Sequence, residues 1–127
     1  MQLTTILPAL ATLVFPVVNA AAIDPWRPAD WVSLGCYKDS REDRLLEFLS
    51  PLSGDKMTVV KCKYACRNAD DSFNAAGLEY GGECFCGDLS DKILGRPTTG
   101  CLTECTGNEN QTCGGPDRID IYTVLDV

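Results

Sequence analysis

Eight cysteines within residues 36–113 constrain this chain more than any other feature. An even number of cysteines at high density in a small chain is typical of a disulfide framework formed in an oxidising compartment. Cys62 and Cys66 are four residues apart, so in a helix both thiols lie on one face. Cys84 and Cys86 are two residues apart and leave the same face of a strand. These spacings favour a helix held against a strand by two parallel disulfides, although spacing alone does not prove the pairing.

The residues before Cys84 predict a β-hairpin. Gly81 and Gly82 accept the positive φ angles of a two-residue turn. Such a turn places Tyr80 directly opposite Glu83, and it makes residues 75–80 the first strand of the hairpin. Cys84 and Cys86 then face the helix. On the opposite face we expect Leu78, Tyr80 and Phe85, so the sheet should bury apolar groups on both sides.

The clearest helix follows Met57, with Thr58 as its N-cap. The expected buried stripe has helical spacing and consists of Val59, Cys62, Cys66 and Ala69. The opposite side of the helix is expected to carry Lys63, Arg67 and Asp70.

Alternating apolar residues predict two further strands, at residues 31–37 and 118–124. Residues 45–54 are apolar but end in a proline and a glycine, and we expect an irregular, partly buried loop there. Residues 88–100 are predicted to be a loop as well. Cys101 and Cys105 are four apart, which favours a short helical turn.

The first 20 residues have the pattern of a secretory signal peptide. An apolar run ends in Val18-Asn19-Ala20, a sequence of small residues that suits cleavage after Ala20, with Ala22 as the second choice. The alternative is a buried helix or a membrane anchor. The apolar run is too short to span a bilayer comfortably, and prolines interrupt it. Residues 21–30 contain two prolines and are expected to be an extended lead-in.

The formal net charge of −7 argues against binding to nucleic acid and to anionic lipid surfaces. The sequence contains no candidate transmembrane segment after residue 20, so no membrane insertion is expected. The alternative for the cysteines is a zinc site. However, the chain has no histidine, and its CxxxC and CxC spacings differ from the CxxC pattern of zinc-binding motifs. We therefore predict no metal and no cofactor.

Catalytic chemistry has few candidate residues here. The absence of histidine removes the usual general base, and cysteines held in disulfides cannot act as nucleophiles. Glu79 and Glu83 flank the predicted turn, and a carboxylate pair can cleave glycosidic bonds. The chain is nevertheless small for a glycosidase cleft, and we predict that it is not an enzyme.

A binding surface requires less. Sugar rings stack on aromatic side chains and form hydrogen bonds with carboxylates and arginine. The aromatic candidates are Tyr37, Tyr80, Tyr122, Trp26 and Trp31; the polar candidates are Asp39, Glu83 and Arg118. Among them, Tyr80 beside Glu83 is the preferred pair, with Tyr37, Asp39 and Arg118 adding to the site. The alternative for each aromatic residue is packing in the core, and for Tyr80 this is a minor core with Leu78 and Phe85.

Several segments resemble the WSC domain, a family named for cell-wall integrity and stress-response components. The resemblance covers residues 31–124 and includes all eight cysteines. The segments are residues 35–39 (GCYKD), 57–59 (MTV) leading to Cys62 and Cys66, 77–87 (GLEYGGECFCG), 105–108 (CTGN), 113–115 (CGG) and 118–122 (RIDIY).

This resemblance implies a small α+β, PAN/apple-like fold with one main helix, an antiparallel sheet and four disulfides. The expected pairs are Cys62–Cys84, Cys66–Cys86, Cys105–Cys113 and Cys36–Cys101, the last supported by the resemblance.

The resemblance also implies carbohydrate binding, typically at fungal cell walls or as an accessory module of carbohydrate-active enzymes. We expect a secreted, monomeric module for a wall polysaccharide such as glucan. The alternative is a secreted protein-interaction domain, or an effector that acts at the wall or at a host surface. Asn110 begins an N-glycosylation sequon, which is either used or left as an unused surface sequon.

Overall fold

The computed structural model describes residues 30–125, and the predicted signal peptide and residues 21–29 lie outside them. The described elements are β1 (Trp31–Lys38), β2 (Phe48–Leu49), α1 (Val59–Ala69), β3 (Ala75–Glu79), β4 (Glu83–Gly87), β5 (Glu104–Cys105), β6 (Asn108–Thr112) and β7 (Arg118–Val124). None of the helices in this part of the chain is long and apolar enough to cross a membrane.

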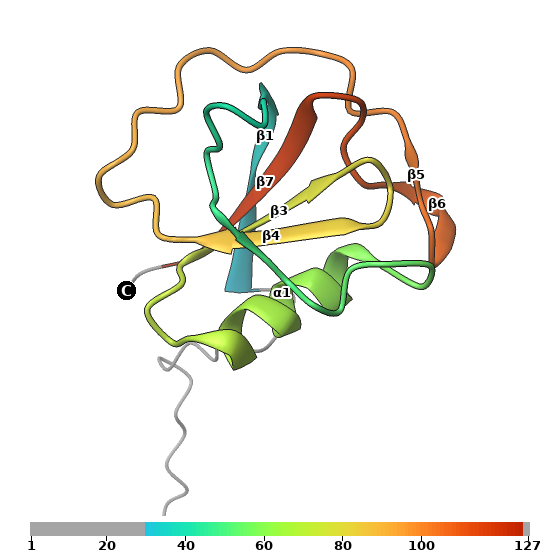
Figure 1. The fold of residues 1–127 in the computed structure, drawn as a ribbon, viewed down its shortest axis with the longest axis horizontal. Coiled ribbons are helices and arrows are strands. Elements are labelled where there is room, and N and C mark those ends of the chain that lie inside the picture. Colours follow the sequence, from blue (N-terminus) through green and yellow to red (C-terminus); the bar gives the residue numbers. More distant parts are fainter. Residues whose placement is uncertain (1–29, 126–127) are drawn as a thin grey trace, which may run out of the picture.

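Five of these strands form one antiparallel sheet in the order β1-β7-β3-β4-β2. The helix α1 lies across one face of this sheet, against β3 and β4 (Figure 1). The strands β5 and β6 form a separate hairpin at one end of the sheet. The predicted class, a small α+β domain with one helix and an antiparallel sheet, is confirmed.

The first and last strands pair with each other along their whole length, from Trp31 opposite Val124 to Lys38 opposite Arg118. Both strands were predicted from their alternating apolar residues. Ile119 and Ile121 are completely buried on one face, while Asp120 between them is only partly covered. A register shift between Ser33 and Gly35 bends β1, and Gly35 there has a φ of 104° that favours glycine.

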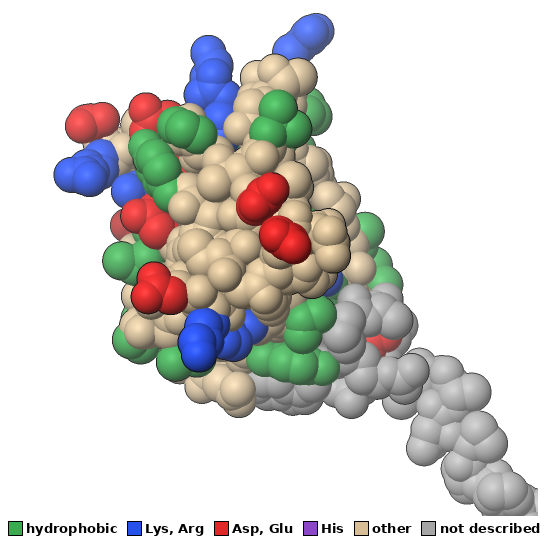
Figure 2. All heavy atoms as spheres, turned by 90° about the vertical axis from the view of Figure 1, so that its right-hand side faces the viewer, with side chains coloured by type: hydrophobic (Ala, Val, Ile, Leu, Met, Phe, Trp, Pro, Cys, Tyr) green, Lys and Arg blue, Asp and Glu red, His purple; other side chains and the backbone are tan. Residues whose placement is uncertain are grey.

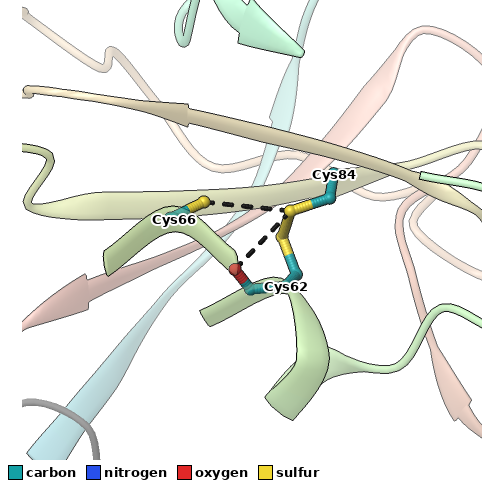
Figure 3. A group of neighbouring side chains, drawn as sticks. All are labelled: Cys62, Cys66 and Cys84. Carbon is teal, nitrogen blue, oxygen red and sulfur yellow. Dashed lines mark hydrogen bonds between the residues drawn. A yellow bond between two sulfur atoms is a disulfide. The ribbon is translucent and has the colours of Figure 1, made fainter. Parts of the chain in front are cut away.

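Four disulfides connect the elements, and all four predicted pairs are confirmed. Cys62–Cys84 and Cys66–Cys86 fasten α1 to β4, Cys36–Cys101 ties β1 to the long loop after β4, and Cys105–Cys113 closes the β5–β6 hairpin. Figure 3 shows the Cys62–Cys84 disulfide with the Cys66 sulfur beside it, and the sulfurs of Cys66 and Cys84 are 3.8 Å apart. Sulfur atoms therefore occupy the centre of the interface between helix and sheet.

The sheet buries apolar side chains on both faces, as expected. The cluster on the helix side is centred on the disulfides, with Met57, Leu78 and Ala76 around them. The second cluster lies on the opposite face and contains Tyr37, Leu46, Ala75, Phe85, Ile119 and Ile121. The segment after β4 runs over that side in Figure 1, and its Leu89 and Leu94 pack against the second cluster.

The hairpin turn differs from the prediction. Glu79, not Tyr80, lies opposite Glu83, so the loop contains three residues: Tyr80, Gly81 and Gly82. Tyr80 leaves the strand with a φ of 55°. The loop is drawn into this shape by neighbouring segments, because Gly81 bonds to the backbone of both Cys113 and Thr106.

The altered turn moves the strand by one residue, and a one-residue shift reverses the faces of its side chains. Leu78 lies opposite Cys84 and belongs to the helix-side cluster, not to the face that carries Phe85. The predicted minor core of Leu78, Tyr80 and Phe85 is therefore wrong.

The helix begins as predicted, because the Thr58 hydroxyl accepts a hydrogen bond from the Lys61 amide at 3.1 Å. The predicted faces need two corrections. Ala69 is exposed near the end of the helix, and Lys63 is buried. The Lys63 ammonium lies 4.6 Å from the centre of the Tyr122 ring and 6.0 Å from that of Trp31, so contacts with aromatic rings replace solvent. Burial lowers the pKa of Lys63.

Thr58→Ala is expected to destabilise the domain by about 1 kcal/mol, because the Lys61 amide loses its capping oxygen. Urea denaturation at neutral pH measures this loss. Thr58→Ser keeps the hydroxyl and should retain most of the stability. Equal stability of the Ala and Ser variants would show that the cap contributes nothing.

Two loop predictions also change. Residues 45–54 include the short edge strand β2. This strand pairs with β4, and Phe48 lies opposite Cys86. The expected helical turn at Cys101 and Cys105 is absent, since Cys105 belongs to β5 and Cys101 lies in irregular backbone. Cys101 is bonded to Cys36 in β1, whereas Cys105 is bonded to Cys113 after β6. The two cysteines therefore need not share one face of a helix.

Candidate carbohydrate-binding site

Tyr80 and Asp117 form the centre of a surface at the tip of the β3–β4 hairpin. They are the non-glycine residues with positive φ in residues 30–125, at 55° and 54°. The Tyr80 hydroxyl donates a hydrogen bond of 2.9 Å to Asp117 Oδ1. This bond raises the pKa of Tyr80. Left-handed backbone at non-glycine residues is unfavourable and often marks functional positions.

Arg118 extends this surface. Its Nε donates to the Thr99 carbonyl at 3.0 Å and its Nη1 to the Asp117 carbonyl at 3.0 Å. No carboxylate of the described residues forms an ion pair with it. A pocket of about 380 Å³ opens beside these groups, lined by Lys38, Asp39, Ser40, Asp43, Asp117 and Arg118. We call Tyr80 and this pocket the hairpin-tip site.

The structure brings Tyr80 and Arg118 together around Asp117, but it separates other predicted residues from them. Tyr37 is only 6% exposed and its hydroxyl donates to the Leu34 carbonyl, so its ring packs in the second cluster. Tyr37 has no free face for a sugar. The preferred pair of Tyr80 and Glu83 on one face is also wrong, because Tyr80 lies in the turn and Glu83 lies opposite Glu79.

Asp39 has a structural role below the pocket. Its carboxylate is inaccessible to solvent and accepts hydrogen bonds from Arg44 Nη1 at 2.9 Å and from the Leu45 amide at 2.8 Å. The same Arg44 nitrogen lies 3.4 Å from Glu79 Oε1. The Arg44 guanidinium also stacks 4.5 Å from the centre of the Phe85 ring. One arginine therefore serves two buried carboxyl groups and an aromatic ring.

Glu79 is the most perturbed acid of this group. Burial raises its pKa to about 9, with hydrogen bonding to Asp39 as the next cause. Its Oε2 is buried and has no hydrogen-bond partner in residues 30–125, and the same is true of Glu83 Oε1. Glu79 is therefore a neutral acid at physiological pH. The carboxyl pair that the sequence suggested for glycosidic cleavage consists of one inaccessible acid and one partly buried neighbour.

Sequence reasoning missed Arg44, Asp117 and the pocket residues Lys38, Ser40 and Asp43. Asp117 is the neighbour of the predicted site residue Arg118 in the sequence. Nothing in the sequence, however, indicated its hydrogen bond with Tyr80. Arg44 lies in a run of charged residues that resembles an ordinary solvated loop.

Three sulfurs, those of Cys62, Cys66 and Cys84, have the proximity of a metal site, all within 4.8 Å of one another (Figure 3). Each belongs to a disulfide, so none is a thiolate that could ligate a metal.

The end of the molecule that carries β5 and β6 has a different character. Figure 2 shows that uncharged polar groups and backbone cover most of this face, together with a few acidic side chains. Asn110 is exposed in β6, and its amide is held by the Asn108 side chain at 2.9 Å. The sequon asparagine is thus accessible on this face.

The fold and the surface define a small disulfide-linked domain with a polar and aromatic recognition surface at one end of its sheet. The sequence model described as "WSC domain" matches residues 33–115. This chain belongs to the WSC domain family, which is linked to carbohydrate binding and occurs in cell-surface proteins.

Similar proteins come from fungi and animals. A WSC domain-containing protein of Arthroderma benhamiae is 35% identical over 87% of this chain, which spans 12% of that protein. Xylosyltransferase oxt of Drosophila melanogaster is 39% identical over 72% of the chain, and Kremen protein 2 of Mus musculus is 42% identical over 72%. The chain spans 10% and 20% of these two relatives. The similarity therefore concerns one domain of much longer proteins.

Proposed function

We propose that this protein is a non-catalytic module that binds a neutral cell-wall polysaccharide such as glucan through the hairpin-tip site. The observation that carries this proposal is the hydrogen bond between the side chains of Tyr80 and Asp117. Both residues have an unfavourable left-handed backbone conformation, and this conformation accompanies the bond. The turn presents the Tyr80 ring, which is 46% exposed, beside a pocket with charges of both signs. An aromatic face and several hydrogen-bonding groups are what a sugar ring requires.

The proposed lack of catalysis is supported by the chemistry of the described residues. Their cysteines are all in disulfides, and Glu79, the carboxyl with a strongly raised pKa, is inaccessible. The proposal includes secretion to the cell surface or wall, supported by the four disulfides and the signal-like residues 1–20.

Tyr80→Ala is expected to weaken retention on insoluble β-1,3-glucan by roughly 5- to 30-fold, which corresponds to about 1–2 kcal/mol of lost stacking. The same change should lower stability by no more than about 1.5 kcal/mol, because it removes one exposed ring and one exposed hydrogen bond. Polysaccharide depletion and thermal melts measure the two quantities.

Two variants complete this test. Tyr80→Phe keeps the ring and loses only the bond to Asp117, so it should retain more binding than Tyr80→Ala. Leu102→Ala removes a side chain that is 80% exposed and outside the site, and should bind like the wild type. Retention that is the same in all three variants would exclude the hairpin-tip site.

The second candidate function is protein interaction, and the exposed apolar residues along and after β2 favour it. Phe48, Leu49 and Leu52 are 40%, 50% and 60% exposed. The strand β2 is an outer strand of the sheet, and unpaired strand edges are able to recruit another chain. Loss of a pulled-down protein in Leu49→Ala, with normal glucan binding, would support this function.

A further inference from the structure

A second pocket, of about 330 Å³, lies at the other end of β4 from the hairpin tip. Cys86 and Gly87, the last residues of β4, contribute to its wall, whereas the hairpin turn precedes the first residue of that strand. The five residues of β4 separate the two places by roughly 13 Å, from the rise per residue of a strand. The two pockets share no lining residue.

The floor of this pocket is aromatic. The rings of Phe48 and Phe73 have centroids 5.3 Å apart and are tilted by 41° to each other. Phe48 lies on the outer strand β2 and opposite Cys86, so no further strand covers it. It remains 40% exposed, whereas Phe73 is partly buried against the helix-side cluster. Leu45 adds an aliphatic wall.

The rim of the pocket is polar and carries fixed groups. Asp88 Oδ1 accepts hydrogen bonds from the Ser90 amide at 2.9 Å, from its hydroxyl at 2.6 Å and from Asn74 Nδ2 at 2.9 Å. The bonds from Ser90, followed by that from Asn74, lower the pKa of Asp88 and keep it ionised. Its other oxygen, Oδ2, forms no hydrogen bond with the described residues and is available as an acceptor.

Lys92 supplies the opposite charge. Its Nζ donates to the Arg44 carbonyl at 3.4 Å and lies 3.6 Å from Glu47 Oε2. The rim thus carries one ammonium, that of Lys92, and two carboxylates, those of Glu47 and Asp88. This balance is slightly negative, which disfavours phosphate, sulfate and uronate groups and leaves uncharged hydroxyl ligands as the better match.

We propose that this pocket is a second binding site, for an uncharged sugar ring of a polysaccharide. The apolar face of the ring packs on Phe48 and Phe73. Its hydroxyls donate to Asp88 Oδ2 and accept from Lys92. The volume lies at the lower end of the range found for small-molecule pockets, which suits one ring better than an extended ligand.

The second site rests on the proposed function and adds avidity to it. A polymer held at both ends of β4 dissociates only when both contacts open, so retention exceeds that of either site alone. A short sugar, by contrast, occupies each site independently. Long and short ligands should therefore respond differently to mutations.

A titration of the isotope-labelled protein with laminaribiose, followed by amide NMR shifts, tests the two sites separately. We expect saturable shifts at Phe48, Gly87 and Asp88 in addition to those at Tyr80 and Asp117. Shifts confined to Tyr80 and Asp117 would overturn the second site and leave the hairpin-tip site in place. Shifts confined to the pocket would overturn the hairpin-tip site alone, and the absence of both would overturn both proposals.

Variants then measure the contribution of the second site on insoluble β-1,3-glucan. Phe48→Ala is expected to weaken retention about 10-fold, and Asp88→Asn, which preserves the Oδ1 acceptor, by a smaller factor. Leu49→Ala is the matched control, since it truncates the adjacent residue of β2, which does not line the pocket. Equal losses in Phe48→Ala and Leu49→Ala would overturn the sugar site, because the effect would then not depend on the ring that lines the pocket.

Tri-galacturonate serves as the anionic probe in the same titration. We expect no shifts at the pocket with this ligand. Binding of the anionic sugar at least as strong as that of laminaribiose would contradict the proposed ligand class. Thermal melts of Phe48→Ala confirm that loss of retention does not reflect unfolding.

Discussion

Reduction of the four disulfides is expected to unfold this domain completely at room temperature. The disulfides close loops with sequence separations of 65, 22, 20 and 8 residues. In the chain-entropy model, each of the three longer loops contributes about 3–4 kcal/mol, and the shortest about 2.5 kcal/mol. Small domains have a total stability of about 5–15 kcal/mol, so the combined loss of the four disulfides is as large as the whole stability of a typical domain. Near-UV circular dichroism with and without reductant measures the result.

Removal of single disulfides should follow a definite order. The pair Cys62–Cys84 lies inside the helix-side cluster, and both residues are fully buried. Replacing both by serine loses the cross-link and places two hydroxyls in an apolar core, so this variant should not fold. Replacing Cys105 and Cys113 removes the shortest loop and should be the mildest double change. A reduced protein that keeps its tertiary signal would show that the disulfides are accessory.

Glu79 is expected to make the domain less stable as the pH rises. Folding raises the pKa of this carboxyl from 4.5 to about 9, mainly through burial. Between these values the folded protein holds a proton that the unfolded chain releases. The contribution of Glu79 to stability is therefore complete below pH 4.5 and is lost as the pH approaches 9, with a slope of about 1.4 kcal/mol per pH unit.

Glu79→Gln isolates this effect, because the amide keeps the shape of the protonated acid and does not titrate. We expect the variant to gain stability relative to the wild type between pH 5 and pH 8, and the difference to vanish near pH 4. Urea denaturation across this range gives both stabilities. Glu109→Gln, at an exposed position of β6, is the control for loss of an ordinary charge. A difference that does not change with pH would contradict the neutral state of Glu79.

The cysteine spacings contained most of the information about the fold. CxxxC determines two thiols on one helical face and CxC two on one strand face, because these follow from the periods of helix and strand. Together with the family resemblance, this was enough to obtain the four pairs. The first and last strands, at residues 31–37 and 118–124, were also recognisable from their alternating apolar residues, and in β7 this alternation corresponds to the buried Ile119 and Ile121.

The local sequence was misleading where distant segments act on it. Gly81-Gly82 is a good two-residue turn in isolation, but Gly81 is held in a three-residue loop, because its amide donates to the Cys113 carbonyl and its carbonyl accepts from the Thr106 amide. Gly82 is required there for a tertiary reason too, because a Cβ on it would lie 2.5 Å from the Gly54 carbonyl oxygen. Lys63 is buried for the same kind of reason, since the rings that receive it belong to the first and last strands.

The candidate sites divide in the same way. The amino-acid sequence by itself determined the disulfide framework, the class of fold and the absence of histidine chemistry, because these depend on residue type and short spacings. Which aromatic residues are exposed depended on register and on loop packing, and these were decided only by the tertiary structure. Tyr37 became a core residue through its place in the second cluster, whereas Tyr80 was forced into an exposed turn and Phe48 onto an outer strand. Contacts between residues far apart in the chain have no periodic signature, so only the folded protein reveals them.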